Sequence, residues 1–331
     1  MPTNKYRCSE FNRVQIKLSN KATLCCLLPE TDIPIDSIFH EKLKLNERIA
    51  CGDFSMCGNC PNIYPVSSIG SSHIHTMDIF TSTLCPSRCF YCAFTEPNSI
   101  TNIAELDKEI PPVAQRVCIK DDIIGALSRY MQSEGGKYLQ SISLSGGDSA
   151  FYPEFISLVN LINEYHLKVI YLSFGVLPVV LEDFVVKKIK NRQLDLSISI
   201  DAVQSETWSQ IKRKPVNLWD KVENFVKRAA IAANGDGVYL KFIVNKINYF
   251  EVSKFIPFWF SRGVKNFSVS AMHACTAEGK RHLCSPDEYS AACESIRLSF
   301  FELPLGEFDK ISLTALDGLE AFFPELPLVR P

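Results

Sequence analysis

Three cysteines stand close together in the stretch of residues 83–94, which reads Thr-Leu-Cys-Pro-Ser-Arg-Cys-Phe-Tyr-Cys-Ala-Phe. Three residues separate Cys85 from Cys89, and two separate Cys89 from Cys92. Thiolates are soft ligands, and three of them in one tight loop can hold one metal cluster. A [4Fe-4S] cluster normally takes four thiolates, so three leave one iron open to another ligand.

This C-x3-C-x2-C spacing, with the aromatic Tyr91 directly before the third cysteine, resembles the signature of the radical S-adenosylmethionine (radical SAM) superfamily. The resemblance implies that Cys85, Cys89 and Cys92 bind a [4Fe-4S] cluster whose open iron chelates S-adenosylmethionine. It further implies reductive cleavage to methionine and a 5'-deoxyadenosyl radical that abstracts hydrogen, with Tyr91 near the adenine. The alternatives are a structural zinc knuckle or a chance grouping. Zinc would require a fourth Cys or His at similar spacing, and none follows before Cys118.

Composition and charge restrict the class of protein. The chain has 331 residues, 46% hydrophobic and 22% charged, which is typical of a globular protein with a sizeable core. A net charge of -2 indicates neither a nucleic-acid nor an anionic-membrane partner. The N-terminus lacks the apolar segment of a secretory signal, and no apolar run approaches the ~20 residues of a spanning helix. We therefore expect a cytoplasmic protein, in which 13 cysteines indicate metal sites or reactive thiols rather than disulfides.

A second group of cysteines lies in residues 1–70, which show no sustained helical period and are interpreted as an N-terminal extension. Cys51, Cys57 and Cys60 have the C-x5-C-x2-C spacing and flanking glycines of a metal loop. Three interpretations are open: an auxiliary iron–sulfur cluster, a zinc site with the same ligands, or ordinary thiols. The spacing alone does not distinguish iron from zinc. The candidates for a fourth ligand are Cys8, Cys25, Cys26 and Cys275.

From His73 onward, segments typical of strands alternate with segments typical of helices, which indicates parallel strands joined by crossover helices. We expect strands over residues 74–81, 138–145, 168–174, 194–201, 238–244 and 266–272. We expect helices over residues 121–132, 152–165, 181–190, 216–233, 250–261 and 286–299. Six such units resemble the partial (β/α)6 TIM-like barrel of the radical SAM family. We accordingly predict an α/β fold with an extension (1–70), a barrel (71–300) and a C-terminal cap segment (301–331).

Polar residues at predicted strand ends are candidate contacts for S-adenosylmethionine. Gly146, Gly147 and Asp148 end the second strand and resemble the family's glycine-glycine-glutamate motif, which binds the amino group. Glycines let a backbone approach a ligand closely, whereas the shorter aspartate leaves the part played by the side chain open. Alone, the segment is an ordinary turn.

At the fourth strand, Ser199 and Asp201 resemble the residues that contact the ribose in the peptide- and cofactor-modifying branch. There, basic residues downstream, here Lys212, Arg213 and Lys214, can meet the carboxylate of S-adenosylmethionine. The alternative is that Asp201 caps a turn and the three basic residues form a solvated face.

Cys275 follows the sixth strand and is a candidate hydrogen-atom donor, whereas His73, His75 and His273 are not interpreted as catalytic. Residues 303–331 contain no cysteine, so the C-terminal SPASM cysteines of many peptide-modifying relatives are absent. The resemblance predicts a radical SAM enzyme acting on a ribosomally made peptide and reduced by a donor such as flavodoxin or ferredoxin. A small metabolite or cofactor precursor is the alternative substrate. A non-catalytic Fe–S or zinc regulatory protein is the alternative of another class.

Overall fold

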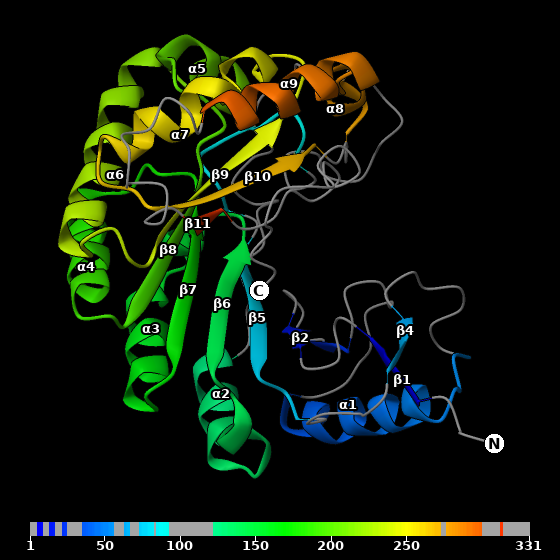
Figure 1. Cartoon of the computed structure of the whole chain (residues 1–331). Helices are drawn as coiled ribbons and strands as arrows, with labels where there is room; N and C mark the ends of the chain where they lie inside the picture. Colours follow the sequence, from blue (N-terminus) through cyan, green and yellow to red (C-terminus); the bar gives the residue numbers. More distant parts are fainter. Residues whose placement is uncertain are drawn as a thin grey trace. The chain divides into compact units, whose positions relative to one another are not determined.

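The computed structural model describes residues 5–8, 13–16, 22–24, 35–55, 63–66, 73–82, 84–92, 122–272, 276–299 and 312–313. They belong to two compact units. Figure 1 labels their helices and strands. Unit 1 comprises Met1–Leu84 and Arg116–Tyr171, and unit 2 comprises Cys85–Gln115 and Leu172–Pro331. No helix within the described part of the chain is long and apolar enough to cross a membrane.

Unit 1 contains a parallel sheet with an added N-terminal strand. Its strand order is β7-β6-β5-β2-β3, and β7 continues into unit 2. β5 pairs in parallel with both β2 and β6, β6 pairs in parallel with β7, and the short β3 pairs antiparallel with β2. The bounds are β2 (Arg13–Ile16), β3 (Ala22–Thr23), β5 (Thr76–Ser82), β6 (Ser141–Gly146) and β7 (Lys168–Ser173).

The helices of unit 1 follow from their apolar spacing. In α2 (Ile123–Gln132), Ile123, Leu127 and Tyr130 are buried, the positions of one helix face. α3 (Phe155–Glu164) buries Phe155, Leu158, Val159 and Ile162, and the ring of Phe155 packs against Tyr171 of β7. Two 3-10 helices, Gly135–Tyr138 and Ser149–Phe151, precede and follow β6. The second strand therefore begins at Ser141, not at residue 138 as predicted.

The N-terminal segment holds more structure than its sequence indicates. α1 (Ile35–Ala50) contradicts the expectation of no sustained helical period, and β1 (Lys5–Cys8) pairs antiparallel with β4 (Ile63–Val66). The buried side of α1 includes Ile38, Lys42, Leu45 and Ile49, which have helical spacing. Because the buried Lys42 is counted as polar, a hydrophobicity pattern does not show the helical period of α1. Its ammonium donates to the carbonyl of Leu24, which satisfies the buried charge in part.

Unit 2 continues the same strand–helix alternation. Its strands are all parallel, in the order β8-β9-β10-β11: β8 (Leu194–Ser199), β9 (Val238–Val244), β10 (Asn266–Ala271) and β11 (Ser312–Leu313). The helices are α4 (Val179–Lys190), α5 (Ser205–Lys212), α6 (Trp219–Ala232), α7 (Val252–Phe260), α8 (Ala277–Arg281) and α9 (Pro286–Ser299). The α/β class with parallel strands is confirmed. The predicted boundaries at residues 70 and 300 stay a prediction.

Aromatic side chains join three of these helices. The rings of Trp208 on α5 and Trp219 on α6 are 6.1 Å apart, and those of Trp219 and Trp259 on α7 are 5.8 Å apart. Trp208 and Trp259 are fully buried. Burial of large aromatic surface is a major stabilising contribution, so this cluster fixes α5 against its neighbours.

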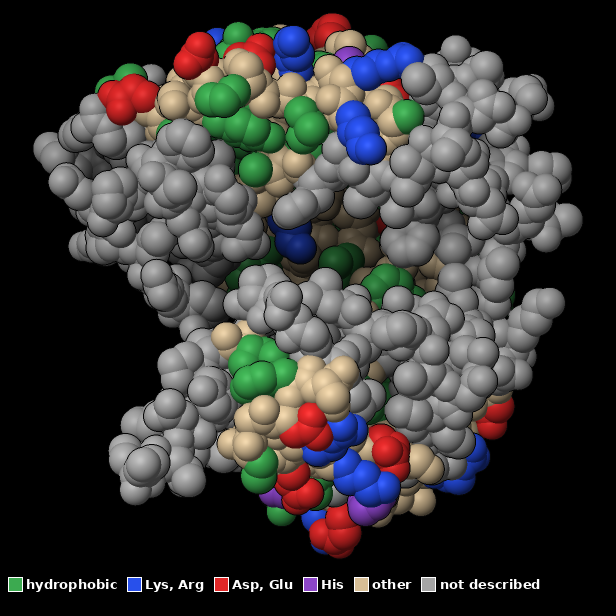
Figure 2. Space-filling model, turned by 90° about the vertical axis from the view of Figure 1, so that its right-hand side faces the viewer, with side chains coloured by type: hydrophobic (Ala, Val, Ile, Leu, Met, Phe, Trp, Pro, Cys, Tyr) green, Lys and Arg blue, Asp and Glu red, His purple; other side chains and the backbone are tan. Residues whose placement is uncertain are grey.

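The charges at the surface are mixed in sign. On the face shown in Figure 2, acidic and basic side chains of the described residues lie beside one another. Among the ion pairs with exposed partners are Lys44–Glu41, Lys137–Glu134 and Arg228–Asp183. Such pairs contribute little to stability because water screens them.

Candidate functional site

The cysteine loop, residues 84–92, is anchored to the C-terminal end of α5. The backbone N–H of Arg88 donates to the carbonyl of Lys212 (3.0 Å), and the hydroxyl of Ser87 donates to the same carbonyl (3.2 Å). The Ser87 hydroxyl also lies 3.1 Å from the sulfur of Cys89. Within the loop, the N–H of Cys92 donates to the carbonyl of Cys89 at 3.0 Å. These contacts give the loop a defined path although it is not a helix or a strand.

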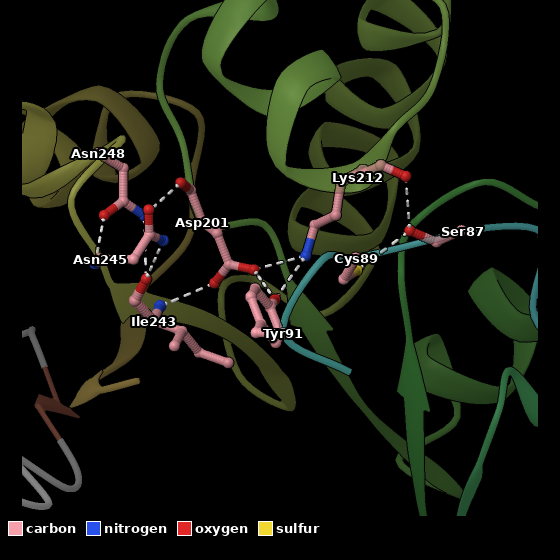
Figure 3. A network of polar contacts seen from close by, with 8 residues as sticks. All are labelled: Ser87, Cys89, Tyr91, Asp201, Lys212, Ile243, Asn245 and Asn248. Atoms are coloured by element: carbon pink, nitrogen blue, oxygen red, sulfur yellow. Dashed lines mark hydrogen bonds and ion pairs between the residues drawn. The ribbon is translucent and has the colours of Figure 1, made fainter. Parts of the chain in front are cut away.

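A buried ion pair between Lys212 and Asp201 lies next to Tyr91 of the loop (Figure 3). Lys212 Nζ is 2.5 Å from Asp201 Oδ2, and both side chains are 0% exposed. The hydroxyl of Tyr91 donates to the same carboxylate oxygen and lies 3.2 Å from Lys212 Nζ. The other carboxylate oxygen accepts the N–H of Ile243 at 2.7 Å. A buried ion pair needs such additional hydrogen bonds to offset its loss of hydration.

The electrostatics of the pair keep Lys212 charged. Burial acts to lower the pKa of Lys212, but the neighbouring Asp201 carboxylate and the nearby Cys89 and Cys85 raise it, and the net shift is upward. Burial, followed by the charge of Asp201, raises the pKa of Tyr91 well above its usual value, so Tyr91 stays a neutral hydrogen-bond donor. The loop cysteines therefore face a permanent buried cation.

The chain on the other side of Asp201 is fixed through asparagines. Asn248 Nδ2 donates to the carbonyls of Asp201 (2.8 Å) and Ile243 (2.9 Å), and Asn245 Nδ2 donates to Ile243 as well (2.9 Å). Asp201 has a positive φ of 59°, a conformation that aspartate tolerates better than most residues. These contacts fix the turn after β8 and keep the carboxylate of Asp201 within hydrogen-bond distance of the Tyr91 hydroxyl.

Apolar and polar contacts hold the outer side of the loop. Phe90 packs in a buried cluster with Ile211 of α5 and Met272, the residue after β10. The hydroxyl of Thr276 donates to the carbonyl of Phe90 and caps α8. The chain leaving α5 is tied to α8 as well, because Arg213 pairs with Glu278.

Comparisons with known proteins bear on the fold. No protein-family model and no curated protein matches the sequence. Among solved structures, SuiB of Streptococcus suis bound to S-adenosylmethionine matches with a TM-score of 0.55 and 12% identity, over 99% of this chain and 75% of that one. SuiB bound to the precursor peptide SuiA matches with a TM-score of 0.55 and 13% identity, over 96% of this chain and 74% of that one. The anSMEcpe structure with bound AdoMet matches with a TM-score of 0.53 and 15% identity. The match covers 72% of this chain and 63% of that one, which is less than two thirds of its length.

The chain has the α/β fold of these solved structures. The expected partial TIM-like barrel is thereby confirmed.

The three loop thiols have the right chemistry for a cluster, but their sulfurs are not already arranged around one metal position. Among the residues that the structure describes, no three His, Cys, Asp or Glu side chains converge closely enough to hold a metal ion. Cys85, Cys89 and Cys92 nevertheless come from one short loop beside a buried cation, which suits the negative charge of a thiolate-ligated cluster. The donor set thus fits a [4Fe-4S] cluster once the side chains turn toward one another.

The Gly-Gly-Asp segment in unit 1 makes several hydrogen bonds within the protein. The carboxylate of Asp148 is fully buried, accepts from the hydroxyl of Tyr171, and caps the next 3-10 helix through the N–H of Ala150 (3.2 Å). The N–H groups of Gly147 and Asp148 donate to the carbonyls of Ser82 (2.6 Å) and Leu84 (2.7 Å). The segment therefore ties the end of β6 to the chain that enters the cysteine loop.

Gly146 is required by this geometry. Its φ is +108°, and an added Cβ would stand 2.5 Å from the carbonyl oxygen of Ser82. Only glycine combines such a conformation with so close a backbone approach.

The other predicted residues are Ser199 and the cysteines outside the loop. Ser199 is partly exposed at the end of β8, and Cys51 is exposed directly after α1. Cys57, Cys60 and Cys275 lie outside the described residues, as do Cys25 and Cys26. Of Cys8, only the backbone, in β1, is described. Contacts with an auxiliary metal and a hydrogen-donor role for Cys275 stay predictions.

Sequence reasoning missed Glu251, which fixes the start of α5. Its buried carboxylate accepts from the N–H groups of Val203 (2.8 Å) and Gln204 (3.3 Å) and from the hydroxyl of Thr207. Carboxylates are favoured at helix N-termini. This one comes from the 3-10 helix Tyr249–Glu251, so no local sequence pattern points to it.

Proposed function

We propose that this protein is a radical SAM enzyme. Cys85, Cys89 and Cys92 would bind a [4Fe-4S] cluster, which in this family supplies the electron that cleaves S-adenosylmethionine to methionine and a 5'-deoxyadenosyl radical. The substrate then loses a hydrogen atom to that radical. The single observation that carries the proposal is the cysteine loop itself, anchored to α5 beside a buried ammonium within this α/β fold.

The chain's own residues would position and insulate the site. Asp201 and Lys212 hold Tyr91 by its hydroxyl, so its ring has a fixed orientation beside the loop for an adenine to pack against. Asp201 would act through Tyr91, as a positioning residue, because its carboxylate oxygens already accept from protein donors. Gly146 and Gly147 would offer backbone groups to the amino group of S-adenosylmethionine. Fixed groups of this kind cost little reorganisation when the ligand binds.

A peptide is the preferred substrate class. SuiB has been solved with its precursor peptide SuiA, and anSMEcpe with AdoMet and the Cp18Cys peptide, at TM-scores of 0.55 and 0.51. These neighbours support the peptide hypothesis, and a small metabolite or cofactor precursor is the alternative. An electron donor such as flavodoxin or ferredoxin, and a cytoplasmic location, belong to the same proposal.

The deciding experiment is anaerobic reconstitution with iron and sulfide, followed by an assay for 5'-deoxyadenosine with dithionite and S-adenosylmethionine. We expect 5'-deoxyadenosine from the wild type and none when Cys85, Cys89 and Cys92 are all replaced by Ala, because the cluster loses its ligands. A Cys284→Ala and Cys293→Ala double variant is the matched control, since both thiols are buried outside the loop. Cleavage by the triple variant would refute the proposal. A wild type that binds iron but never cleaves S-adenosylmethionine would favour a regulatory iron–sulfur protein.

The auxiliary site is tested with the same triple variant. If Cys51, Cys57 and Cys60 hold a second [4Fe-4S] cluster, the variant should retain about four irons. A colourless variant with one zinc ion would indicate a zinc site. A variant without either metal would remove the auxiliary site from the proposal.

A further inference from the structure

Two stacked layers of aromatic side chain connect the cysteine loop with the surface of unit 2. Phe90, the residue directly after Cys89, is 3% exposed, and its ring centroid lies 4.6 Å from that of His282. His282 is the residue after α8 and is partly exposed. Consecutive Cα atoms are about 3.8 Å apart, so a short path through two rings leads from a predicted cluster ligand to the surface.

Basic side chains surround His282. The residue lies at the C-terminal ends of β9 and β10, where α8 is placed (Figure 1), and its carbonyl accepts the N–H of Lys246 at 2.9 Å. Burial lowers the pKa of His282, and three nearby positive charges lower it further against one opposing carboxylate. The three bases are Arg213, Lys246 and Arg281, and the acid is Glu278.

Three exposed bases of this region form a local excess of positive charge, which we call the α8 patch. They are Lys246, Lys280 and Arg281, and none of the acidic residues that the structure describes pairs with them. The acids close to them in sequence serve other groups. Glu278 pairs with Arg213, whereas Asp287 and Glu288 lie in the first turn of α9, where carboxylates stabilise a helix.

Other surface arginines of unit 2 differ from the α8 patch because their charges are balanced. Arg228 pairs with Glu182 and Asp183, and Arg262 pairs with Glu223. The chain as a whole has a net charge of -2, so the patch is a local feature. A patch of one sign attracts partners of the opposite charge and speeds their association.

We propose that the α8 patch is the docking site of a small electron-carrier protein with an acidic surface. The inference rests on the proposed function, in which each cleavage of S-adenosylmethionine consumes one electron. Electron transfer between proteins slows steeply with distance, so the carrier must bind close to the loop, as the path through Phe90 and His282 allows. One electron passes from the reduced carrier to the oxidised cluster. The carrier is oxidised, the cluster is reduced, and no bond forms or breaks.

The test measures reduction of the cluster directly. Reduced flavodoxin is mixed anaerobically with the reconstituted enzyme in the absence of S-adenosylmethionine, and the EPR signal of the reduced cluster in rapidly frozen samples gives the rate constant. The patch variant combines Lys246→Gln, Lys280→Gln and Arg281→Gln. The control variant combines Lys187→Gln, Lys190→Gln and Lys227→Gln, which removes as many exposed charges from α4 and α6.

We expect flavodoxin to reduce the patch variant at least about tenfold more slowly than the wild type at low ionic strength, because electrostatic steering is lost. The control variant should behave as the wild type does. Added salt should slow the wild type more than the patch variant, since it screens the attraction. Dithionite, which needs no docking site, should reduce all three proteins alike. Equal rate constants for the patch and control variants with flavodoxin would overturn the inference.

Binding of oxidised flavodoxin, measured by calorimetry on the same preparations, separates the remaining outcomes. Flavodoxin that binds at the patch but does not reduce a cluster that dithionite reduces would overturn the inference in favour of another acidic partner. Cleavage of S-adenosylmethionine with no effect of the patch variant loses only the inference. Patch-dependent binding of flavodoxin to a protein that never cleaves S-adenosylmethionine loses only the proposed function.

Discussion

Asp201 and Asp148 are both fully buried, both follow a parallel strand, and both accept a hydrogen bond from a tyrosine. Their other partners differ. Asp201 binds the ammonium of Lys212 and the N–H of Ile243, whereas Asp148 caps a 3-10 helix through Ala150. One carboxylate thus joins a charged network that reaches three separate elements, and the other joins the turn after β6 to Tyr171 of β7. The same residue type after a strand can therefore compensate a buried cation or accept from neutral donors alone.

The largest effect is expected from removing the cation of the Asp201 network. Lys212→Met should lower the free energy of unfolding by about 3–5 kcal/mol, because it leaves a buried carboxylate uncompensated. Urea denaturation of the apoprotein measures this. Arg228→Met is the control at a surface ion pair, with an expected loss of at most about 1 kcal/mol.

The double variant Lys212→Met, Asp201→Asn should recover part of the lost unfolding free energy, because the buried carboxylate of Asp201 is then no longer present as an unpaired charge. If Lys212→Met and Arg228→Met lower the free energy of unfolding equally, the buried ion pair does not stabilise the protein more than a surface pair does.

The two tyrosines give a matched pair of intermediate effects. Tyr91→Phe and Tyr171→Phe each remove a hydroxyl that donates to a buried aspartate, so each should cost about 1–3 kcal/mol of stability. Only Tyr91→Phe should also slow formation of 5'-deoxyadenosine, since Tyr91 lies between two loop cysteines. A comparison of unfolding curves with initial cleavage rates separates the two effects. Equal rates for both variants would remove Tyr91's hydroxyl from the site.

The smallest effect on S-adenosylmethionine chemistry is expected at Asp148. Asp148→Ala should cost about 1–3 kcal/mol of stability, because it removes the cap and leaves the buried Tyr171 hydroxyl without this acceptor. It should retain all cluster iron and weaken S-adenosylmethionine binding less than tenfold, measured by equilibrium dialysis of the reconstituted protein. A larger loss of affinity with iron retained would show that the carboxylate contacts the ligand, and the two aspartates would then be alike in function.

The strands and most helices of the barrel could be predicted because their apolar periods are regular. β9 and α9 begin and end at the residues expected from the sequence. Two of the missed helices, α1 and α5, place polar residues on their buried sides: Lys42 and Asn46 in α1, Thr207 and Lys212 in α5. A hydrophobicity pattern counts these residues as exposed and loses the helical period.

The Lys212 network could not be predicted for a similar reason. The sequence left open whether Lys212 belongs to a solvated face, and that alternative is wrong, because the residue is 0% exposed. Its partners lie 11 and 121 residues away along the chain, so only the tertiary fold brings them together. The spacing of Cys85, Cys89 and Cys92, in contrast, is local and could be read directly from the sequence.

The aromatic cluster of α5, α6 and α7 has a practical consequence. All 3 tryptophans of the chain lie in it, so intrinsic fluorescence reports on one place in unit 2. Trp208 and Lys212 are four residues apart on α5, hence on the same side of the helix that anchors the cysteine loop. Iron–sulfur clusters absorb broadly where tryptophan emits. Loading of the cysteine loop should therefore quench the emission, which provides an optical signal for cluster assembly without any added label.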